Sequence, residues 1–311
     1  MSDIKTGVVV RSTGSWYEIR TAGKNLYSCK LKGRFKIKGI RTTNPIAVGD
    51  RVDFKLPEDK QTGLITHIHE RKNYIIRKAT KLSKSSHIIA ANLDQAVLIV
   101  SLTKPRTSSG FIDRFLVTAE AYHIPAVLVF NKFDLYNNIH KKQLDEYVKV
   151  YSTAGYRCLV TSAKTGFHLK AFKSTLREKV SLLAGHSGVG KSALINKIDP
   201  LLNLKEGEIS SVHQKGKHTT TFAQMFPLDF GGDIIDTPGI KEFGLVEFEK
   251  TELGQRFPEI RRLMGQCRFS DCLHVNEPGC AVRQAVEKGD FPVFRYRNYL
   301  NMLNDIQPAL Y

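Results

Sequence analysis

The chain has 311 residues, 41% hydrophobic and 25% charged, which is typical of a globular protein long enough for two or three separate cores. Its formal net charge is +17, and residues 1–84 hold 19 lysines and arginines against 7 acidic residues, or +12, which leaves 28 against 23, or +5, for the rest. Charge concentrated in this way indicates a polyanionic partner such as a nucleic acid, although a solvated basic surface has the same composition.

The sequence has none of the features of an exported or membrane-spanning protein. It begins MSDIKTGVVV, without an apolar signal core, and the longest apolar run, at residues 96–100, is far too short to cross a bilayer. Three of the five cysteines fall within residues 267–280, which favours a reducing compartment over a disulfide framework. We therefore expect a cytoplasmic protein with no membrane partner, and nothing indicates an obligate dimer, so we expect a monomer.

The first 70 residues are predicted to form short strands separated by turns. Apolar and polar residues alternate in SWYEIR and RVDFKL, as they do in half-buried strands. Five such strands without a long helix indicate a small closed barrel, and an OB-fold is the leading candidate because that barrel suits nucleic-acid binding; another small barrel without a ligand is the alternative. The predicted strands are residues 6–12, 15–22, 25–33, 49–56 and 63–71.

After the basic, serine-containing stretch at residues 77–87, predicted strands and helices alternate. The apolar runs at residues 94–102 and 125–134 end in polar residues, as buried strands of a parallel sheet do, and residues 111–122 and 143–154 have helical spacing. This order predicts an α/β domain with a parallel sheet. The same pattern continues with a strand and turn at 156–166, a helix at 168–180, a strand before residue 185, a helix near 192–198 and two strands within 222–239.

The stretch GHSGVGKS at residues 185–192 satisfies the phosphate-loop pattern in full. Its glycines let backbone N–H groups converge on phosphate oxygens, and the following helix directs its positive end at them. We predict that Lys191 contacts the β- and γ-phosphates and that Ser192 binds Mg²⁺. The predicted strand before the loop and helix after it favour this interpretation over a glycine-rich turn without a ligand.

The motif NKFD, Asn131–Asp134, ends a predicted strand and suits guanine. The Asp134 carboxylate can accept hydrogen bonds from both N1–H and the N2 amine, a pair of donors that adenine lacks. Asn131 can tie this loop to the phosphate loop, and the Lys132 stem can pack over the base. Ser162–Lys164 follows the next strand and can offer a backbone N–H to guanine O6. A polar surface turn is the alternative for each motif taken alone.

Two further motifs complete a nucleotide site. Asp236–Gly239, DTPG, closes a predicted strand, so that Asp236 would hold Mg²⁺ directly or through water and the Gly239 N–H would contact the γ-phosphate. Upstream, the HTTT stretch at residues 218–221 offers a threonine to the Mg²⁺ shell, although the pattern does not decide which one, and a plain polar loop is the alternative.

The order of these motifs along the chain differs from that of most nucleotide hydrolases, in which the phosphate loop lies near the start of the domain. Here both base-reading loops precede it. Cutting a GTPase before its base-reading strands and joining the old ends produces this order, and compact domains tolerate such permutation because their termini are often neighbours. We therefore predict a circularly permuted GTPase domain, in which DTPG lies at the exit and leads directly into the last domain.

The last domain carries the pattern C-x4-C-x-H-x5-C at residues 267–280. Three thiolates and one imidazole match a closed, tetrahedral zinc site of the structural kind, and metal binding would supply much of the folding energy of so small a segment. Reduced cysteines packed as small hydrophobes are the alternative. Cys29 and Cys158 belong to no cluster and are expected in the barrel or core. The predicted zinc ligands are Cys267, Cys272, His274 and Cys280.

Taken together, these motifs resemble the RsgA family, also called YjeQ or YloQ, of bacterial GTPases that depend on the small ribosomal subunit. The resemblance covers essentially the whole chain and implies an OB-fold RNA-binding domain (1–72), a circularly permuted P-loop GTPase domain (73–244) and a mostly helical zinc-binding domain (245–311). It implies 30S-stimulated GTP hydrolysis as a checkpoint in late 30S maturation, with the 30S subunit, its 16S rRNA and GTP or GDP as partners and Zn²⁺ and Mg²⁺ as cofactors. The alternatives are an rRNA-binding protein in which nucleotide mainly stabilises the fold, and a permuted GTPase that acts on another RNA.

The site residues follow from the motifs and the resemblance. Ile240 follows DTPG where a Ras-like enzyme has a glutamine, so we expect slow intrinsic hydrolysis, with water placement completed on the ribosome. His218 is the candidate for this role because an imidazole can polarise water, unless it only contacts RNA. The predicted Mg²⁺ ligands are Ser192, Thr220 and Asp236. The predicted GTP-binding residues are Asn131, Lys132, Phe133, Asp134, Ser162, Ala163, Lys164, Gly185, His186, Ser187, Gly188, Val189, Gly190, Lys191, Ser192, Ala193, Thr219, Thr220, Asp236 and Gly239.

Overall fold

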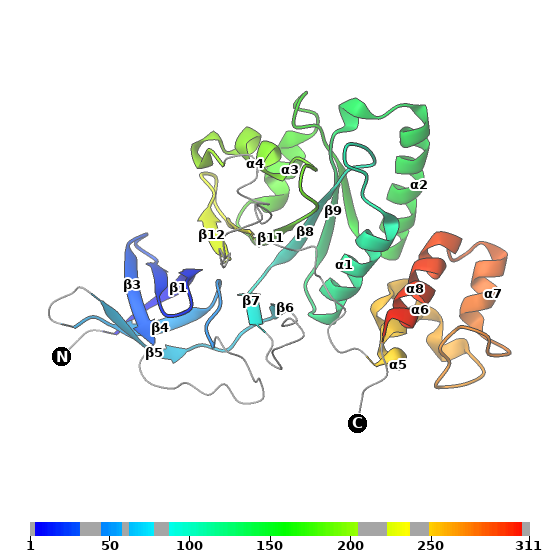
Figure 1. The fold of residues 1–311 in the computed structure, drawn as a ribbon, viewed down its shortest axis with the longest axis horizontal. Coiled ribbons are helices and arrows are strands. Elements are labelled where there is room, and N and C mark those ends of the chain that lie inside the picture. Colours follow the sequence, from blue (N-terminus) through cyan, green and yellow to red (C-terminus); the bar gives the residue numbers. More distant parts are fainter. Residues whose placement is uncertain are drawn as a thin grey trace, which may run out of the picture.

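Three parts follow one another along the chain: a β-barrel, a sheet covered by helices on both faces, and a group of helices (Figure 1). The barrel and the C-terminal helices lie on opposite sides of the central domain. Among the helices described, none is both long enough and apolar enough to span a membrane. The computed structural model describes residues 4–31, 45–57, 62–77, 87–204, 223–236 and 249–306.

The N-terminal barrel has the five strands that the sequence predicts. They are ordered β1-β2-β3-β5-β4, and a β1–β4 pairing closes the barrel, as in an OB-fold. The alternation of side chains along each strand determines which residues face the barrel interior: in β4, Val52 and Phe54 are buried, and the residues at its two ends are exposed. Cys29 lies in this core as expected, and burial raises the pKa of its thiol to about 12. The strands are β1 (Ile4–Ser12), β2 (Tyr17–Thr21), β3 (Leu26–Leu31), β4 (Arg51–Lys55) and β5 (Gly63–Ile68).

A two-stranded hairpin follows the barrel, which the sequence pattern did not predict. It consists of β6 (Tyr74–Arg77) and β7 (His87–Ala91), paired antiparallel. Both strands are short and stand beside a basic stretch, so no turn signal or long alternation marks them. Tertiary contacts hold them in place: Ile75 is buried, and Ala90 pairs with Val48 in a parallel bridge.

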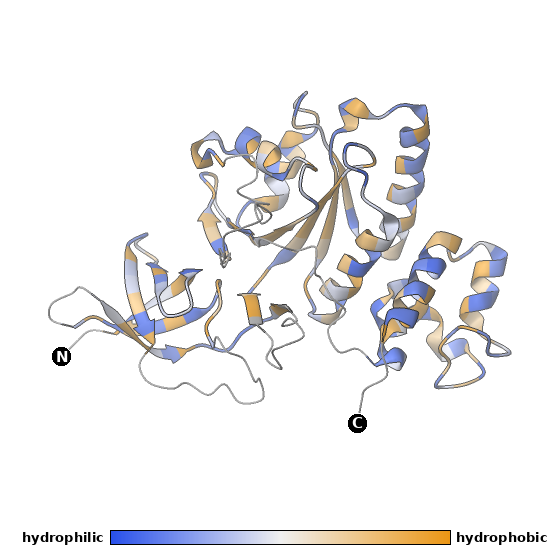
Figure 2. Cartoon of the chain, viewed as in Figure 1, coloured by the Kyte–Doolittle hydropathy of each residue, from blue (hydrophilic) through white to orange (hydrophobic). Residues whose placement is uncertain are grey.

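The central sheet has the strand order β10-β9-β8-β11-β13-β12. The first five strands are parallel, and β12 is antiparallel to β13. Parallel strands covered on both faces read as continuous apolar runs, and the strands at the centre of the sheet are mostly orange, or hydrophobic, in Figure 2. All six residues of β8 are buried. The strands are β8 (Gln95–Val100), β9 (Ala126–Phe130), β10 (Arg157–Val160), β11 (Val180–Ala184), β12 (Gln224–Pro227) and β13 (Asp233–Asp236).

Helices cover both faces of this sheet. Leu98 of β8 packs into one apolar cluster with residues of α1 and α2, and its neighbour Ile99 packs into a second cluster with residues of α3 and α4. The helix predicted over residues 168–180 ends earlier, because Glu178 takes a positive φ of 57° and the chain then enters β11. The helices are α1 (Ser109–Ala121), α2 (Asn138–Ala154), α3 (Leu169–Leu176) and α4 (Lys191–Ile198), with 3-10 turns at Phe133–Leu135 and Pro200–Leu202.

The strand order accounts for the late position of the phosphate loop. The chain enters the sheet at β8 and leaves it at β13, and these strands lie on either side of β11. The glycine-rich loop follows β11, the fourth strand of the domain in chain order, yet it is at the centre of the sheet. The domain is therefore a circularly permuted α/β fold.

The C-terminal region is helical, as expected, and packs against α1. Its core includes Phe257, Phe291 and Tyr299, and Val117 of α1 belongs to the same apolar cluster. The helices are α5 (Lys250–Leu253), α6 (Pro258–Leu263), α7 (Ala281–Lys288) and α8 (Val293–Asp305), with 3-10 turns at Gly254–Arg256 and Met264–Gln266.

Candidate nucleotide site and cysteine–histidine cluster

The loop between β11 and α4 has the strand–loop–helix geometry that the phosphate-loop pattern predicts. Gly185 and Gly190 have positive φ angles of 142° and 97°. A Cβ on Gly185 would lie 2.2 Å from the Ile99 carbonyl oxygen, and one on Gly190 would lie 2.4 Å from Asn131 Nδ2. Both glycines are therefore required by backbone conformation and by close neighbours.

Lys191 places its ammonium group against this loop. Its Nζ donates hydrogen bonds to the carbonyl oxygens of Gly185, at 2.7 Å, and His186, at 3.0 Å. The side chain is buried, and this burial lowers the pKa of Lys191 to about 8, although the Asp236 carboxylate opposes the shift. Ser192, at the start of α4, and Asp236, at the end of β13, are also buried. A cation, a hydroxyl and a carboxylate thus follow the neighbouring strands β11 and β13 at one end of the sheet, a combination that suits Mg²⁺ and phosphate.

Asn131 joins the phosphate loop to both base-reading loops. Its Nδ2 donates to the Val189 carbonyl oxygen at 2.9 Å, and its Oδ1 accepts from Ala163 N and Thr161 Oγ1, each at 3.3 Å. The side chain is only 1% exposed, so all of this hydrogen bonding is internal. The predicted tie between NKFD and the phosphate loop is thus present.

Asp134 is positioned by the second base-reading loop. Ser162 Oγ donates to Asp134 Oδ1 at 2.5 Å and accepts from Thr165 N at 3.2 Å. Asp134 is an exposed residue, whereas Ser162 is fully buried. Lys132 takes a left-handed conformation with φ of 65°, and its Nζ donates to the Lys104 carbonyl oxygen. Asp134 therefore stands at the accessible edge of the site, where a ligand can reach its carboxylate.

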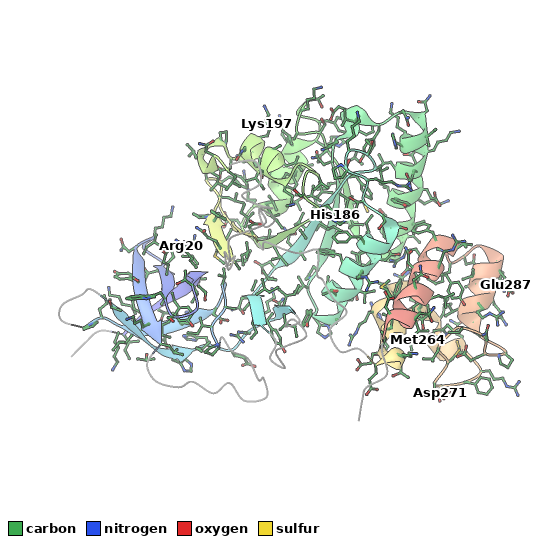
Figure 3. All side chains as sticks on the ribbon, viewed as in Figure 1. Arg20, His186, Lys197, Met264, Asp271 and Glu287 are labelled. Carbon is green, nitrogen blue, oxygen red and sulfur yellow. The ribbon has the colours of Figure 1, made fainter. Side chains whose placement is uncertain are left out.

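The segment after β8 also borders the phosphate loop, which the sequence patterns did not predict. Pro105 Cδ is 3.5 Å from the position of a Cβ on Gly188, and the Phe111 ring packs against the His186 ring with centroids 4.0 Å apart (His186 is labelled in Figure 3). The one available signal was that this segment follows the carboxyl end of a parallel strand, where ligand sites of α/β folds lie.

Five of the residues singled out from the sequence lie outside the described part of the chain, so their roles stay predictions. They are His218, Thr219, Thr220, Gly239 and Ile240.

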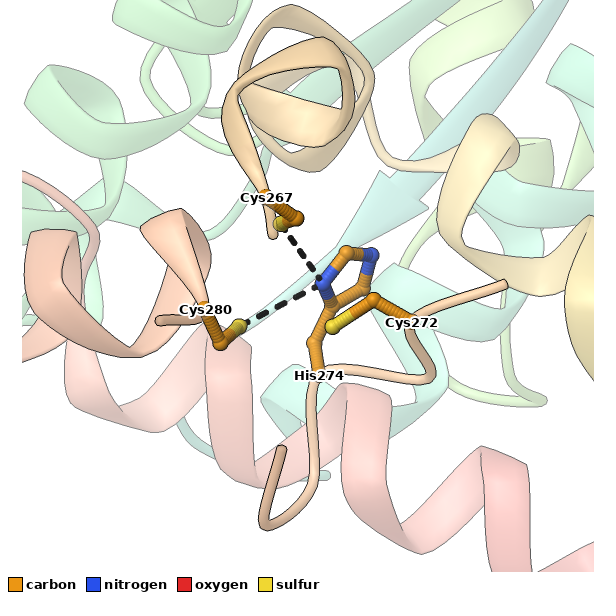
Figure 4. A group of neighbouring side chains, drawn as sticks. All are labelled: Cys267, Cys272, His274 and Cys280. Carbon is orange, nitrogen blue, oxygen red and sulfur yellow. Dashed lines mark hydrogen bonds between the residues drawn. The ribbon is translucent and has the colours of Figure 1, made fainter. Parts of the chain in front are cut away.

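In the C-terminal region, the three predicted cysteines and the histidine lie together (Figure 4). Their ligand atoms are all within 4.8 Å of one another, and His274 Nδ1 is 3.6 Å from Cys267 Sγ and 3.5 Å from Cys280 Sγ. A tetrahedral zinc site with its usual bond lengths has ligand–ligand separations of about 3.6 Å. The cluster can therefore hold a zinc ion with little rearrangement.

The backbone around the cluster is held in place by neighbouring side chains. The Glu277 carboxylate accepts from the backbone N–H groups of Leu273 and Val275 at 2.8 Å, and from that of Asn276 at 3.0 Å. From α8, Tyr296 donates its hydroxyl to the His274 carbonyl oxygen at 2.6 Å. These contacts fix the loop that carries two of the four ligand residues.

The fold and the nucleotide loops define a P-loop GTPase domain in circularly permuted order, with a barrel before it and a cysteine–histidine cluster after it. A family model described as RsgA GTPase matches residues 68–246, more than half of the chain, and one described as RsgA N-terminal domain matches residues 6–65. The chain belongs to the RsgA GTPase family and is a GTP-hydrolysing enzyme.

Individual relatives agree with this assignment. The chain is 52% identical over 305 residues to "Small ribosomal subunit biogenesis GTPase RsgA 2" of Bacteroides thetaiotaomicron, covering 98% of each chain, and 51% identical to the RsgA of Porphyromonas gingivalis, covering 96% of each. Among solved structures it resembles YjeQ from Thermotoga maritima, with a TM-score of 0.78 and 36% identity over 97% of this chain and 98% of that one. It also resembles YloQ, described as a circularly permuted GTPase, with a TM-score of 0.76 and 30% identity over 99% and 98%.

Proposed function

We propose that this GTPase acts in biogenesis of the small ribosomal subunit, the role that the names of its relatives state for those proteins. The GTP-bound protein docks on the 30S subunit and its 16S rRNA in the cytoplasm, as a monomer. Hydrolysis, stimulated by the subunit, follows a check on the subunit's structure late in its maturation. The observation that carries this proposal is the 52% identity to the Bacteroides thetaiotaomicron relative over 98% of this chain. The aligned length spans the barrel, the nucleotide loops and the cluster.

The proposed division of labour follows the three parts of the chain. Residues 1–72 bind RNA, residues 73–244 bind and hydrolyse GTP, and residues 245–311 hold zinc. In the barrel, Trp16 is 41% exposed, and Lys30 Nζ lies 4.0 Å from the centroid of its ring. An exposed aromatic ring beside a cation suits stacking on a base next to a phosphate, which supports an RNA-binding role for this surface.

In the proposed guanine site, Asp134 accepts from N1–H and the N2 amine of the base, and Ser162 holds that carboxylate in position. The Ser162–Lys164 loop offers a backbone N–H to guanine O6, and the Lys132 stem covers the base. Asn131 keeps these loops in register with the phosphate loop. Adenine would place its N1 acceptor against the Asp134 carboxylate and has no amine at C2, so the carboxylate would lose both hydrogen bonds. Guanine is therefore preferred.

At the phosphate end, the residues from Gly185 to Ala193 surround the α-, β- and γ-phosphates. Lys191 exchanges its two carbonyl partners for phosphate oxygens, and Ser192 and Asp236 hold Mg²⁺ together with Thr220. When bound, Mg²⁺ neutralises charge on the phosphates during transfer to water. In the C-terminal cluster, zinc has a structural role, since all four positions are taken by protein ligands.

For hydrolysis itself, we propose His218 as the residue that orients the attacking water, with the docked subunit completing its placement. The apolar Ile240 cannot do this, so the free enzyme is expected to be slow. A His218→Ala variant should lose most of the 30S-stimulated turnover while it keeps its affinity for GDP. Full stimulated turnover in that variant would assign the histidine to RNA contact instead.

The decisive measurement is GTP turnover by the purified protein alone and with 30S subunits, 50S subunits or naked rRNA. Strong stimulation by 30S subunits only is the expected result. Lys191→Ala should abolish turnover and the maturation function together, because phosphate binding is lost. Equal, slow turnover in every mixture, with function intact in Lys191→Ala, would favour an RNA-binding protein whose nucleotide only stabilises the fold. Stimulation by another RNA would redirect the proposal to that partner.

A further inference from the structure

Beside the base-reading loops, three aromatic rings form a stack whose central member no nucleotide motif includes. The Phe167 ring stacks on both Phe133 and His168, with centroids 5.1 Å from Phe133 at an interplanar angle of 20° and 3.8 Å from His168 at 27°. Phe167 is nevertheless 38% exposed. A large apolar side chain that is this exposed gains less from burial than a core residue does, so its position depends mainly on the two stacked neighbours.

The stack connects the two loops assigned to guanine. Phe133 belongs to NKFD and precedes Asp134, and its backbone N–H donates to the Thr161 carbonyl oxygen at 3.1 Å. The Phe167 carbonyl oxygen accepts from Ser162 N at 3.2 Å, so Phe167 and the second base-reading loop, Ser162–Lys164 (here called the SAK loop), are parts of one turn. Stacking Phe167 on Phe133 therefore limits how far Ser162 can move from Asp134.

The far side of the stack is anchored as well. His168 has a positive φ of 56° at the start of α3, and its Nδ1 lies 3.0 Å from the Val160 carbonyl oxygen of β10. Phe133 is held on its other side by Tyr136, whose ring meets it edge-on at 5.9 Å and whose hydroxyl donates to the Asn131 carbonyl oxygen at 2.8 Å. These contacts thus tie the stack to the ends of β10 and β9.

We propose that Phe167 is a positioning residue for guanine selectivity: by stacking on Phe133 it holds the SAK loop against NKFD, so that Ser162 keeps the Asp134 carboxylate aligned with the guanine N1–H and N2 amine. This inference rests on the proposed guanine site and adds a residue to it. Phe167 acts through Asp134 and does not itself touch the reacting phosphates. Its loss should weaken binding and base discrimination and leave kcat at saturating GTP unchanged.

The test compares the affinities of purified variants for GDP and IDP, since the hypoxanthine base of IDP lacks the N2 amine. In Phe167→Ala, we expect GDP binding to weaken about two- to tenfold, the range that an aromatic pair provides, and the preference for GDP over IDP to fall. Phe167→Tyr should restore both values. Phe269→Ala is the matched control, because Phe269 is 40% exposed but lies in the C-terminal region.

A double-mutant cycle with Phe133→Leu separates stacking from general destabilisation. If the rings act as a pair, the combined variant should lose little more affinity than either single variant. Fully additive losses, or an unchanged GDP-to-IDP ratio in a folded Phe167→Ala protein, would overturn the positioning role. Asp134→Asn tests the site itself. If that variant keeps its preference for guanine, the guanine assignment fails. If Asp134→Asn loses the preference but Phe167→Ala keeps it, only the role of Phe167 is refuted.

Discussion

The barrel and the C-terminal region are attached to the central domain in very different ways. The C-terminal region is joined through a buried charge network. Arg295 of α8, only 1% exposed, donates to Asp113 of α1 at 2.6 Å and to both oxygens of Glu259 at 2.9 and 2.8 Å. Burial alone would lower the pKa of Arg295, but the two carboxylates raise it well above its ordinary value. The guanidinium therefore stays charged, and its partners are fixed with it.

The barrel, in contrast, is joined by short strand pairings, apolar packing and one ion pair: Val10 and Val48 share an apolar cluster with Leu93, and Ala91 N donates to the Val48 carbonyl oxygen at 2.9 Å. Its β1 continues the central sheet through a single residue pair, Arg11 with Gln224 of β12, and Arg20 forms an ion pair with Asp233 of β13 at 2.7 Å. A pocket of about 470 Å³ lies beside this contact, lined by residues of both parts, including Arg51. The barrel thus contacts β12 and β13, the two strands between the HTTT and DTPG motifs, whereas the C-terminal region is fixed to a helix on the opposite side of the domain.

This difference indicates which contacts would be lost if either part were reoriented relative to the central domain. Reorienting the C-terminal region would expose buried charges. Reorienting the barrel would instead break two short strand pairings and one ion pair and would uncover Val10 and Val48, which belong to an apolar cluster of the central domain. Gln224 also pairs with Asp236 within the sheet, so β1, β12 and the end of β13 lie side by side next to the nucleotide loops. A displacement of Asp236 on hydrolysis would therefore reach the barrel through two paired residues, Gln224 and Arg11.

Metal removal should have the largest effect and should affect only one of the two parts. Structural zinc supplies about 10–16 kcal/mol in small zinc-dependent peptides, and the C-terminal core is small. Chelation, or Cys272→Ser, should therefore expose the amides of residues 249–306 to hydrogen exchange, while the barrel keeps its protection. Cys158→Ser, outside the cluster, is the control. Unchanged exchange after verified loss of metal would contradict a structural role.

Arg295→Met should give the next largest loss. The substitution leaves Asp113 and Glu259 buried beside an uncharged side chain, which typically costs about 3–5 kcal/mol. The free energy of unfolding, measured in urea, should fall accordingly. Arg297→Met, on the same helix but exposed, is the matched control and should change little. Equal stability of the two variants would mean that the network does not fix the C-terminal region.

Gly49→Ala should have an intermediate effect, because it tests the backbone contact between the barrel and the hairpin. Gly49 has a φ of 93°, and a Cβ there would lie 2.1 Å from the Ala91 carbonyl oxygen. We expect a loss of about 1–3 kcal/mol in thermal or urea unfolding. Gly14→Ala controls for the conformation, since Gly14 has a similar φ of 85° with nothing within 4 Å of the added atom. If both variants lose the same free energy of unfolding, the close approach of Gly49 to Ala91 does not contribute to stability.

Arg20→Met should have the smallest effect. Its ion pair with Asp233 leaves about one-fifth of each side chain exposed, so water still screens the charges. Breaking the pair should cost about 1 kcal/mol, less than breaking the fully buried contact of Arg295 with Asp113. A double-mutant cycle with Asp233→Asn measures the pair directly. A coupling of several kcal/mol would show that the barrel is attached as firmly as the C-terminal region, and the contrast between the two parts would disappear.

Much of the site could be predicted because its chemistry is encoded in short spacings. GHSGVGKS, NKFD and the cysteine–histidine pattern each place their groups within a few residues, so local backbone geometry nearly determines the arrangement. The barrel strands were predictable for the same reason, since alternation over five residues already decides which side chains face inward. Cys29 in the barrel core follows from that alternation.

Contacts between distant segments could not be predicted in this way. The β6–β7 hairpin has too few residues to show a period and depends on packing against Val48. The loop that carries Pro105 reaches the phosphate loop only because β8 and β11 are neighbours in the sheet.

By itself, then, the sequence indicated the nucleotide loops and the candidate metal-ligand set, because each motif depends on residues close together in the chain. It also indicated the permuted fold, because the order of those motifs can be read along the chain. Tertiary structure alone decided that Arg295 meets Asp113, 182 positions away, and that Arg20 meets Asp233, 213 positions away. Such pairings have no local signature, since a buried arginine and an exposed one look alike until the packing around them removes water.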